Sequence, residues 1–120
     1  MPSFYSKVTG IGGSVPEFVQ AGILVLFGEQ VPPELQDIAI VHAPGTFEQE
    51  VVPGHVMLLG TAKFRVTAVG LVANRNLREL GHAVIKFNGL TVPELPGDLC
   101  VEALAIPDVK IGDPILISDH

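Results

Sequence analysis

The side chains of this 120-residue chain that change charge near neutral pH are its histidines. There are four of them: His42, His55, His82 and His120. His42 ends the apolar run 38–42, and a Pro-Gly turn follows it. Because side chains alternate along an extended strand, His42 points the same way as Ile38 and Ile40. A ring in line with two isoleucines is either a core histidine with satisfied hydrogen bonds or a residue with a chemical role.

The second candidate is His82, which closes segment 76–82 and opens another apolar run. The preceding Gly81 lets a second backbone or side chain approach closely. The alternative for His82 is a strand-start histidine that hydrogen-bonds a loop carbonyl. His55 follows a Pro-Gly turn, where a solvated position is expected, and His120 is terminal and is given no role.

Other kinds of chemistry have little support. The acidic residues are scattered over turns, and the few serines lie near the termini without a nucleophile-elbow pattern. A zinc site from His42, His55 and His82 is an alternative, but no short ligand pair is present, so we predict no metal. The glycine-rich segment 10–13 lacks a helix that would receive a phosphate at its N-terminus, so we predict no nucleotide cofactor.

Charge and composition limit the partners. The chain has 13 acidic and 7 basic residues and a net charge of −6, which disfavours nucleic acid and permits a basic protein partner. Its one cysteine, Cys100, forms no internal disulfide; we expect it to be buried and the protein to be cytoplasmic. We see no signal peptide and no apolar run that would span a bilayer, so any membrane connection goes through a partner.

Thirteen glycines and ten prolines divide the chain into short apolar pieces. This pattern predicts a single domain over residues 1–120, an all-β, partly open β-barrel of short strands with one to three short helical turns. Exposed edge strands in such a domain permit a homodimer. The helical signals are a capping box at 14–17 and possible turns at 32–36 and 76–80. The expected strands are 5–11, 23–27, 38–43, 55–59, 63–72, 83–88, 99–106 and 115–118.

Several segments together resemble one family. They are Val-Thr-Ala-Val-Gly at 66–70, Asn-Leu-Arg-Glu-Leu-Gly-His at 76–82 and Lys-Phe-Asn-Gly-Leu at 86–90, with supporting segments at 23–27, 31–35, 52–54 and 59–60. The chain is similar in these segments, and in their order, to the glucitol/sorbitol-specific IIA component of the bacterial sugar phosphotransferase system (PTS). Val41-His42, with Gly45 three residues on, resembles the segment that carries the family's phosphorylated histidine. Some members have a second histidine where this chain has Pro44, so any help from that ring is missing.

The resemblance implies a phosphoryl carrier. Such a protein accepts a phosphoryl group from the phosphocarrier protein HPr on a histidine, here His42, and passes it to a cysteine of the IIB component. The membrane components IIB and IIC then phosphorylate the sugar during its uptake, and no metal or cofactor is required. We expect His82, the backbone of Gly45 and Thr46, and the Thr46 hydroxyl as candidate donors to the phosphate.

We also expect both partners to bind a shallow apolar depression near His42, with Ile38 and Ile40 in its floor and Glu48 and Glu50 on its rim. An ordinary solvated face is the alternative for both glutamates. For the whole chain the alternative function is a non-catalytic regulatory or binding β-barrel module.

Overall fold

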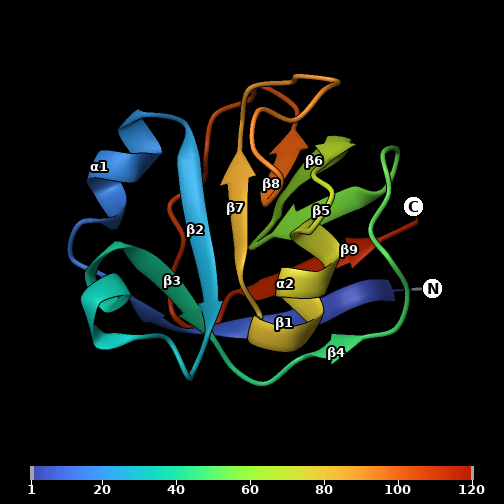
Figure 1. Ribbon diagram of the computed structural model, residues 1–120. Coiled ribbons are helices and arrows are strands. Elements are labelled where there is room, and N and C mark those ends of the chain that lie inside the picture. Colours follow the sequence, from blue (N-terminus) through green and yellow to red (C-terminus); the bar gives the residue numbers. More distant parts are fainter. Residues whose placement is uncertain (1, 120) are drawn as a thin grey trace.

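The computed structural model describes residues 2–119 and is built mainly from short strands that curve into a ring (Figure 1). Residues 2–119 contain three helices, all of them short: α1 (Val15–Gln20), the 3-10 helix η1 (Pro33–Ile38) and α2 (Ala73–Leu80). The strands described are β1 (Pro2–Ile11), β2 (Ile23–Gly28), β3 (Ala39–His42), β4 (Thr46–Phe47), β5 (Val56–Leu59), β6 (Ala62–Val69), β7 (Ala83–Lys86), β8 (Asp98–Val101) and β9 (Pro114–Ser118).

The strands follow the order β3-β2-β7-β8-β6-β5-β9-β1, and pairing between β1 and β3 closes the ring. Closure depends on the length of β1. Its first part pairs with β9, with Phe4 opposite Ile117, and its last part pairs with β3, with Val8 opposite His42. The predicted all-β barrel with short helical turns is confirmed, and the pairing between β1 and β3 closes the barrel that the sequence predicts to be partly open. Because the ring is closed, β4 alone lies outside it, beside β1, so the edge-strand reason for a homodimer applies only there.

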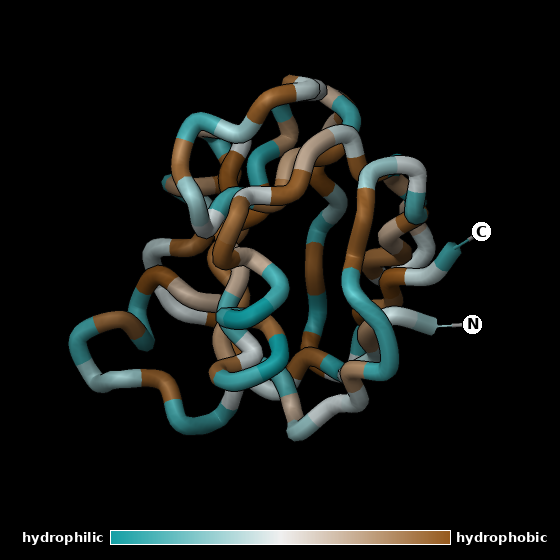
Figure 2. The backbone as a smooth tube through the Cα atoms, turned by 45° about the vertical axis from the view of Figure 1, so that its right-hand side comes forward, coloured by the Kyte–Doolittle hydropathy of each residue, from teal (hydrophilic) through white to brown (hydrophobic). Residues whose placement is uncertain are grey.

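The core fills the inside of the ring. Side chains that alternate along the strands meet there, and Figure 2 shows hydrophobic and hydrophilic residues following one another along the extended segments of the backbone. Each large side chain buried in this way contributes about 1.5–3 kcal/mol. The largest fully buried apolar side chains are Phe64, Leu24, Leu26, Ile40, Met57, Leu59, Ile85, Leu99, Ile115 and Ile117.

Helix α1 begins after Ser14, as the sequence predicts, but the predicted capping box does not form. The Ser14 side chain makes no capping hydrogen bond and instead donates to Asp37 Oδ2, at 2.5 Å. The hydroxyl therefore joins α1 to the 3-10 helix η1. No helix among residues 2–119 has the length and apolar character needed to cross a membrane.

Helix α2 begins three residues earlier than the predicted turn at 76–80, and it ends where predicted. Gly81 adopts a left-handed conformation with φ 64°. Its N–H donates to the Leu77 carbonyl at 3.0 Å, and the His82 N–H donates to the Asn76 carbonyl at 3.1 Å. These two bonds satisfy the last carbonyls of the helix, which is the usual reason for glycine at this position.

The predicted strands 63–72 and 99–106 run furthest past the C-terminal ends that the structure gives them. Strand β6 stops at Val69, because Gly70 turns tightly against the 95–96 backbone: a Cβ on Gly70 would lie 2.2 Å from the Pro96 carbonyl oxygen. Strand β8 stops at Val101, and the chain then runs irregularly to β9. Strand β4 has only two residues, too few to give a sequence pattern.

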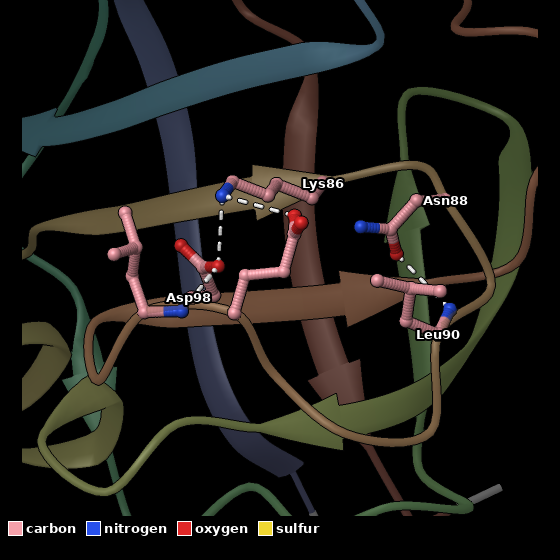
Figure 3. A network of polar contacts seen from close by, with 6 residues as sticks. Lys86, Asn88, Leu90 and Asp98 are labelled. Carbon is pink, nitrogen blue, oxygen red and sulfur yellow. Dashed lines mark hydrogen bonds and ion pairs between the residues drawn. The ribbon is translucent and has the colours of Figure 1, made fainter.

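One buried ion pair joins neighbouring strands. Lys86 Nζ on β7 lies 2.8 Å from Asp98 Oδ2 on β8, and Figure 3 shows the contact as a dashed line. The Asp98 side chain is 1% exposed. Asp98 also accepts the Leu95 N–H at 3.0 Å, and Glu94 lies 3.6 Å from the same ammonium group. The hydrogen bond to Asp98 holds the pKa of Lys86 above its usual value of 10.5, so the Lys86 ammonium group is charged at neutral pH.

Candidate functional site

His42 is the last residue of β3, and its side chain is buried, with 2% exposed. Its Nδ1 lies 2.9 Å from the Ala43 carbonyl oxygen and 3.2 Å from Ser6 Oγ. Ser6, on the neighbouring β1, is itself buried and donates its hydroxyl hydrogen to the Ala43 carbonyl at 2.5 Å. The Ser6 hydroxyl and the Ala43 carbonyl together fix the orientation of the ring.

The other ring nitrogen of His42 also faces a carbonyl oxygen. Nε2 lies 2.7 Å from the carbonyl oxygen of Gly81, at the end of α2. A carbonyl only accepts hydrogen bonds, so both contacts are satisfied together only when both ring nitrogens carry a hydrogen. Each nitrogen of the ring therefore faces a carbonyl acceptor in this arrangement. A nucleophilic Nε2 needs a free lone pair, so it requires the Gly81 carbonyl to move away.

Gly81 is placed against His42 by its left-handed conformation. A Cβ built on Gly81 would lie 2.7 Å from His42 Cε1 and 2.8 Å from Nε2. Glycine is thus required here for two reasons: its φ is 64°, and a side chain would collide with the imidazole. The sequence marks Gly81 as a helix stop, and the structure adds that it covers the ring.

A cavity of about 520 Å³ lies beside His42. It is bounded by the turn after β3, by the loop after β2 and by the last turn of α2. The imidazole therefore belongs to the wall of a cavity, although little of it is exposed. The lining residues are Phe4, Phe27, Gly28, Glu29, Gln30, His42, Ala43, Pro44, Gly45, Phe47, Leu77, Arg78, Glu79, Leu80 and Gly81.

The apolar part of this cavity is formed by three aromatic rings (Phe4, Phe27 and Phe47) and by aliphatic side chains such as Leu77 and Leu80. The Phe4 ring meets the His42 ring edge-on, with centroids 5.4 Å apart, and Phe4 lies opposite Phe47 in the β1–β4 pairing. The expected floor of Ile38 and Ile40 is wrong, because Ile40 is fully buried in the barrel core and neither residue lines the cavity.

The acidic residues that line the cavity are Glu29 and Glu79. The expected Glu48 and Glu50 are exposed and do not line it, which agrees with their alternative as a solvated face. Glu29 follows β2 and Glu79 lies in the last turn of α2, so both come to this place through the fold and not through closeness to His42 in sequence.

The ring of His82 contacts β2. Its Nδ1 lies 3.1 Å from the Leu26 carbonyl oxygen, and the ring stacks on Phe27 with centroids 4.4 Å apart. Among the residues described, His82 does not line the cavity, and it is the preceding Gly81 that reaches His42. This contact is close to the alternative given for His82, a hydrogen bond to a loop carbonyl, except that Leu26 lies in strand β2.

Gly45 lines the cavity, and Thr46 does not. A Cβ on Gly45 would lie 2.3 Å from the Tyr5 carbonyl oxygen, so the turn after β3 passes closely over β1. Thr46 is exposed and pairs with Tyr5 at the start of β4. The backbone of Gly45 is therefore the nearer of the two predicted phosphate donors to the cavity.

The other histidines and the cysteine lie elsewhere. His55 is half-buried instead of solvated, since its Nδ1 lies 3.1 Å from Oγ of the buried Ser3. His120 lies outside the described residues. Cys100 is buried as expected, and burial raises the pKa of its thiol. Across residues 2–119 no three His, Cys, Asp or Glu side chains gather in a way that would hold a metal ion.

Two residues at this site were not singled out from the sequence. Ser6 is one of several hydroxyl residues near the N-terminus, and nothing local marks it as a partner of His42. Arg78 lines the cavity and places its guanidinium carbon 5.8 Å from the centre of the Phe47 ring. Arg78 lies inside the segment 76–82 that carries the family resemblance. Its place in that segment is the signal by which the sequence could have pointed to it.

The barrel fold is also found in a solved structure. The chain aligns with the crystal structure of the PTS system IIA component from Enterococcus faecalis V583 with a TM-score of 0.78, at 22% identity, over 92% of this chain and 96% of that chain. The shared feature at this identity is the fold.

The sequence relationship is more specific. The family model for the PTS glucitol/sorbitol-specific IIA component matches residues 3–116. The chain is 37% identical over 109 residues to the PTS glucitol/sorbitol-specific EIIA components of Shigella flexneri and of Escherichia coli K12, which covers 91% of this chain and 89% of each relative. The chain therefore belongs to the glucitol/sorbitol-specific IIA family of the phosphotransferase system, and the resemblance stated from the sequence is confirmed.

Proposed function

We propose that this chain is a cytoplasmic phosphoryl carrier that holds the phosphoryl group on His42. Phospho-HPr is the donor, and the acceptor is the cysteine of the IIB component, which works with the membrane component IIC in sorbitol (glucitol) uptake. Membership of the IIA family supports the carrier role. One observation supports the site: among residues 2–119, His42 is the histidine that lines the cavity between the β3 turn and the end of α2.

The nucleophile in this proposal is Nε2 of neutral His42. Nδ1 keeps its hydrogen because the Ala43 carbonyl, 2.9 Å away, accepts it, and the lone pair is then on Nε2. As the Nε2–P bond forms, the P–N bond of the donor phosphohistidine breaks and the donor ring keeps the electron pair. In the second transfer the IIB thiolate attacks phosphorus, and the electron pair of the Nε2–P bond returns to His42.

Nε2 has to be uncovered before either transfer. The Gly81 carbonyl occupies its hydrogen-bonding direction at 2.7 Å, and the adjacent Leu80 is 52% exposed. A partner protein that binds the exposed end of α2 contacts the segment that covers the nucleophile. Docking and uncovering are then one event, which keeps the phosphohistidine away from water between transfers.

The other residues predicted for the site, Gly45, Thr46 and His82, assist His42 in this proposal. Gly45 borders the cavity, so its N–H is a candidate donor to the phosphoryl oxygens, with Thr46 next to it at the start of β4. His82 contacts Leu26 and Phe27, so we assign it to holding the Gly81 turn in place. Its substitution should therefore slow transfer without abolishing it.

The second candidate function is a barrel that binds or regulates and transfers nothing. The burial of His42 and the hydrogen bonds at both of its nitrogens favour this alternative. The two functions differ in one observable, the covalent capture of phosphate from phospho-HPr.

The experiment is to incubate the chain with ³²P-phospho-HPr and to measure acid-labile protein-bound phosphate. We expect stoichiometric label on the wild type, none on His42→Ala and slower labelling of His82→Ala. His55→Ala is the matched control, because it removes a half-buried ring that is hydrogen-bonded elsewhere, and it should label normally. Normal labelling of a folded His42→Ala variant would refute the site, and an unlabelled wild type would favour the binding module.

A further inference from the structure

The cavity beside His42 is lined by one cationic side chain, Arg78. Its guanidinium carbon lies 5.8 Å from the centre of the Phe47 ring, within the range of a cation–π contact. Phe47 lies opposite Phe4, and the Phe4 ring meets the ring of His42. These contacts place the guanidinium group and the imidazole on the same aromatic wall.

The charge of Arg78 is not neutralised within the described chain. The ion pairs found among residues 2–119 belong to Lys86, and Arg78 is exposed. Its neighbour Arg75, one turn earlier on α2, is also exposed but does not line the cavity. The two arginines therefore share a helix, a residue type and a solvent exposure, and they differ in access to His42.

A phosphoryl group on His42 would meet a negative environment. The last turn of α2 points its carbonyls, the negative end of the helix dipole, towards the ring, and Glu29 and Glu79 line the same cavity. A phosphoryl group adds about two negative charges at neutral pH. Without a cation nearby, these charges would repel one another in a partly water-excluded site.

We propose that Arg78 is the phosphate-binding residue of this site. This inference rests on the proposed phosphorylation of His42. The guanidinium group leaves the Phe47 face and donates two parallel hydrogen bonds to the phosphoryl oxygens during transfer. It makes and breaks no covalent bond: the P–N bond of the donor breaks as the Nε2–P bond forms, and Arg78 neutralises the charge on the equatorial oxygens.

The test uses two phosphoryl donors, phospho-HPr and the small molecule phosphoramidate, with Arg78→Met, Arg78→Lys and the control Arg75→Met. We expect Arg78→Met to lower the initial labelling rate about 10- to 100-fold with both donors, less than the loss of a fully buried donor group. Arg78→Lys should recover part of the rate, because it restores the charge without the planar fork. Arg75→Met should stay within about twofold of the wild type, since that side chain does not line the cavity.

The ³¹P resonance of the phosphorylated protein gives a second measurement. It should move in Arg78→Met and stay in place in Arg75→Met, because only Arg78 contacts the phosphate. Slower labelling by phospho-HPr with unchanged labelling by phosphoramidate would assign Arg78 to partner docking and overturn the inference. Unchanged rates with both donors would also overturn it. A wild type that accepts phosphate from neither donor would refute the proposed function itself.

Discussion

Two of the buried polar side chains of the barrel, Asp98 and His42, are held in opposite ways. Asp98 is paired with a full opposite charge, Lys86, and also accepts a backbone N–H. His42 is as deeply buried, but its partners are the neutral Ser6 hydroxyl and two main-chain carbonyl oxygens. One of those carbonyls belongs to Gly81, in the turn after a helix.

The two groups differ in the free energy that is needed to separate each of them from its partner. Separating Lys86 from Asp98 leaves a charge buried in the protein, which is strongly unfavourable. Moving the Gly81 carbonyl away from His42 exchanges one neutral acceptor for another group or for water, which costs far less. Burial alone therefore does not distinguish a structural polar group from a functional one. The charge of its partners is the more informative property.

The largest expected effect is at the ion pair. Lys86→Met leaves Asp98 buried without its counter-ion and should lower the free energy of unfolding by about 3–5 kcal/mol. Urea denaturation measures this, and Lys63→Met, at an exposed lysine, is the control, expected within about 0.5 kcal/mol of the wild type. Labelling of the folded Lys86→Met variant by phospho-HPr should be unchanged. A loss of labelling would mean that the two buried groups are coupled.

Gly81→Ala should have the next largest effect. A non-glycine residue in the left-handed region costs about 1–2 kcal/mol, and the new Cβ would also press on the His42 ring. Gly22→Ala is the matched control, because Gly22 has φ 78° but nothing within 4 Å of its added Cβ. We expect both variants to lose stability in urea denaturation, Gly81→Ala more than Gly22→Ala, and only Gly81→Ala to label slowly. If the two variants lost the same stability and labelled at the same rate, Gly81 would have no specific role at the site.

Ser6→Ala should have the smallest effect on stability, about 1 kcal/mol for one hydrogen bond. We regard Ser6 as a positioning residue, since it acts through the Nδ1 side of His42. Removal of the Ser6 hydroxyl should change the pH profile of the labelling rate as well as the rate itself. Ser3→Ala is the control, because it removes another buried β1 hydroxyl, one that contacts His55. Identical pH profiles for the two variants would argue against positioning by Ser6.

Much of the barrel could be predicted because its strands carry their own signal. Segment 23–27 is an apolar run bounded by turn residues, and it became β2 almost unchanged. Strand β4 could not be predicted, because two residues carry no periodicity and Thr46–Phe47 is fixed by pairing with β1. Closure of the ring likewise depends on one long strand serving two neighbours, a property that no local pattern reports.

The site was predictable only in part, for the same reason. The run that ends at His42 and the glycine that stops α2 were both visible in the sequence, but their contact joins residues that are far apart in the chain. His82 attracted attention as a titratable ring, whereas the group that reaches His42 is the backbone of the residue before it. Main-chain atoms have no sequence signature, so a site built from carbonyl oxygens stays hidden until the fold is known.

The pairing of β1 with β9 has a consequence for biosynthesis. Tyr5 lies opposite Leu116, so an early strand must wait for nearly all of the intervening chain before it finds its partner. The nascent polypeptide therefore carries unpaired β1 and β5 edges while it is being made, and such edges invite intermolecular association. A nascent chain that stops before β9 would lack the strand that lies between β5 and β1 in the barrel.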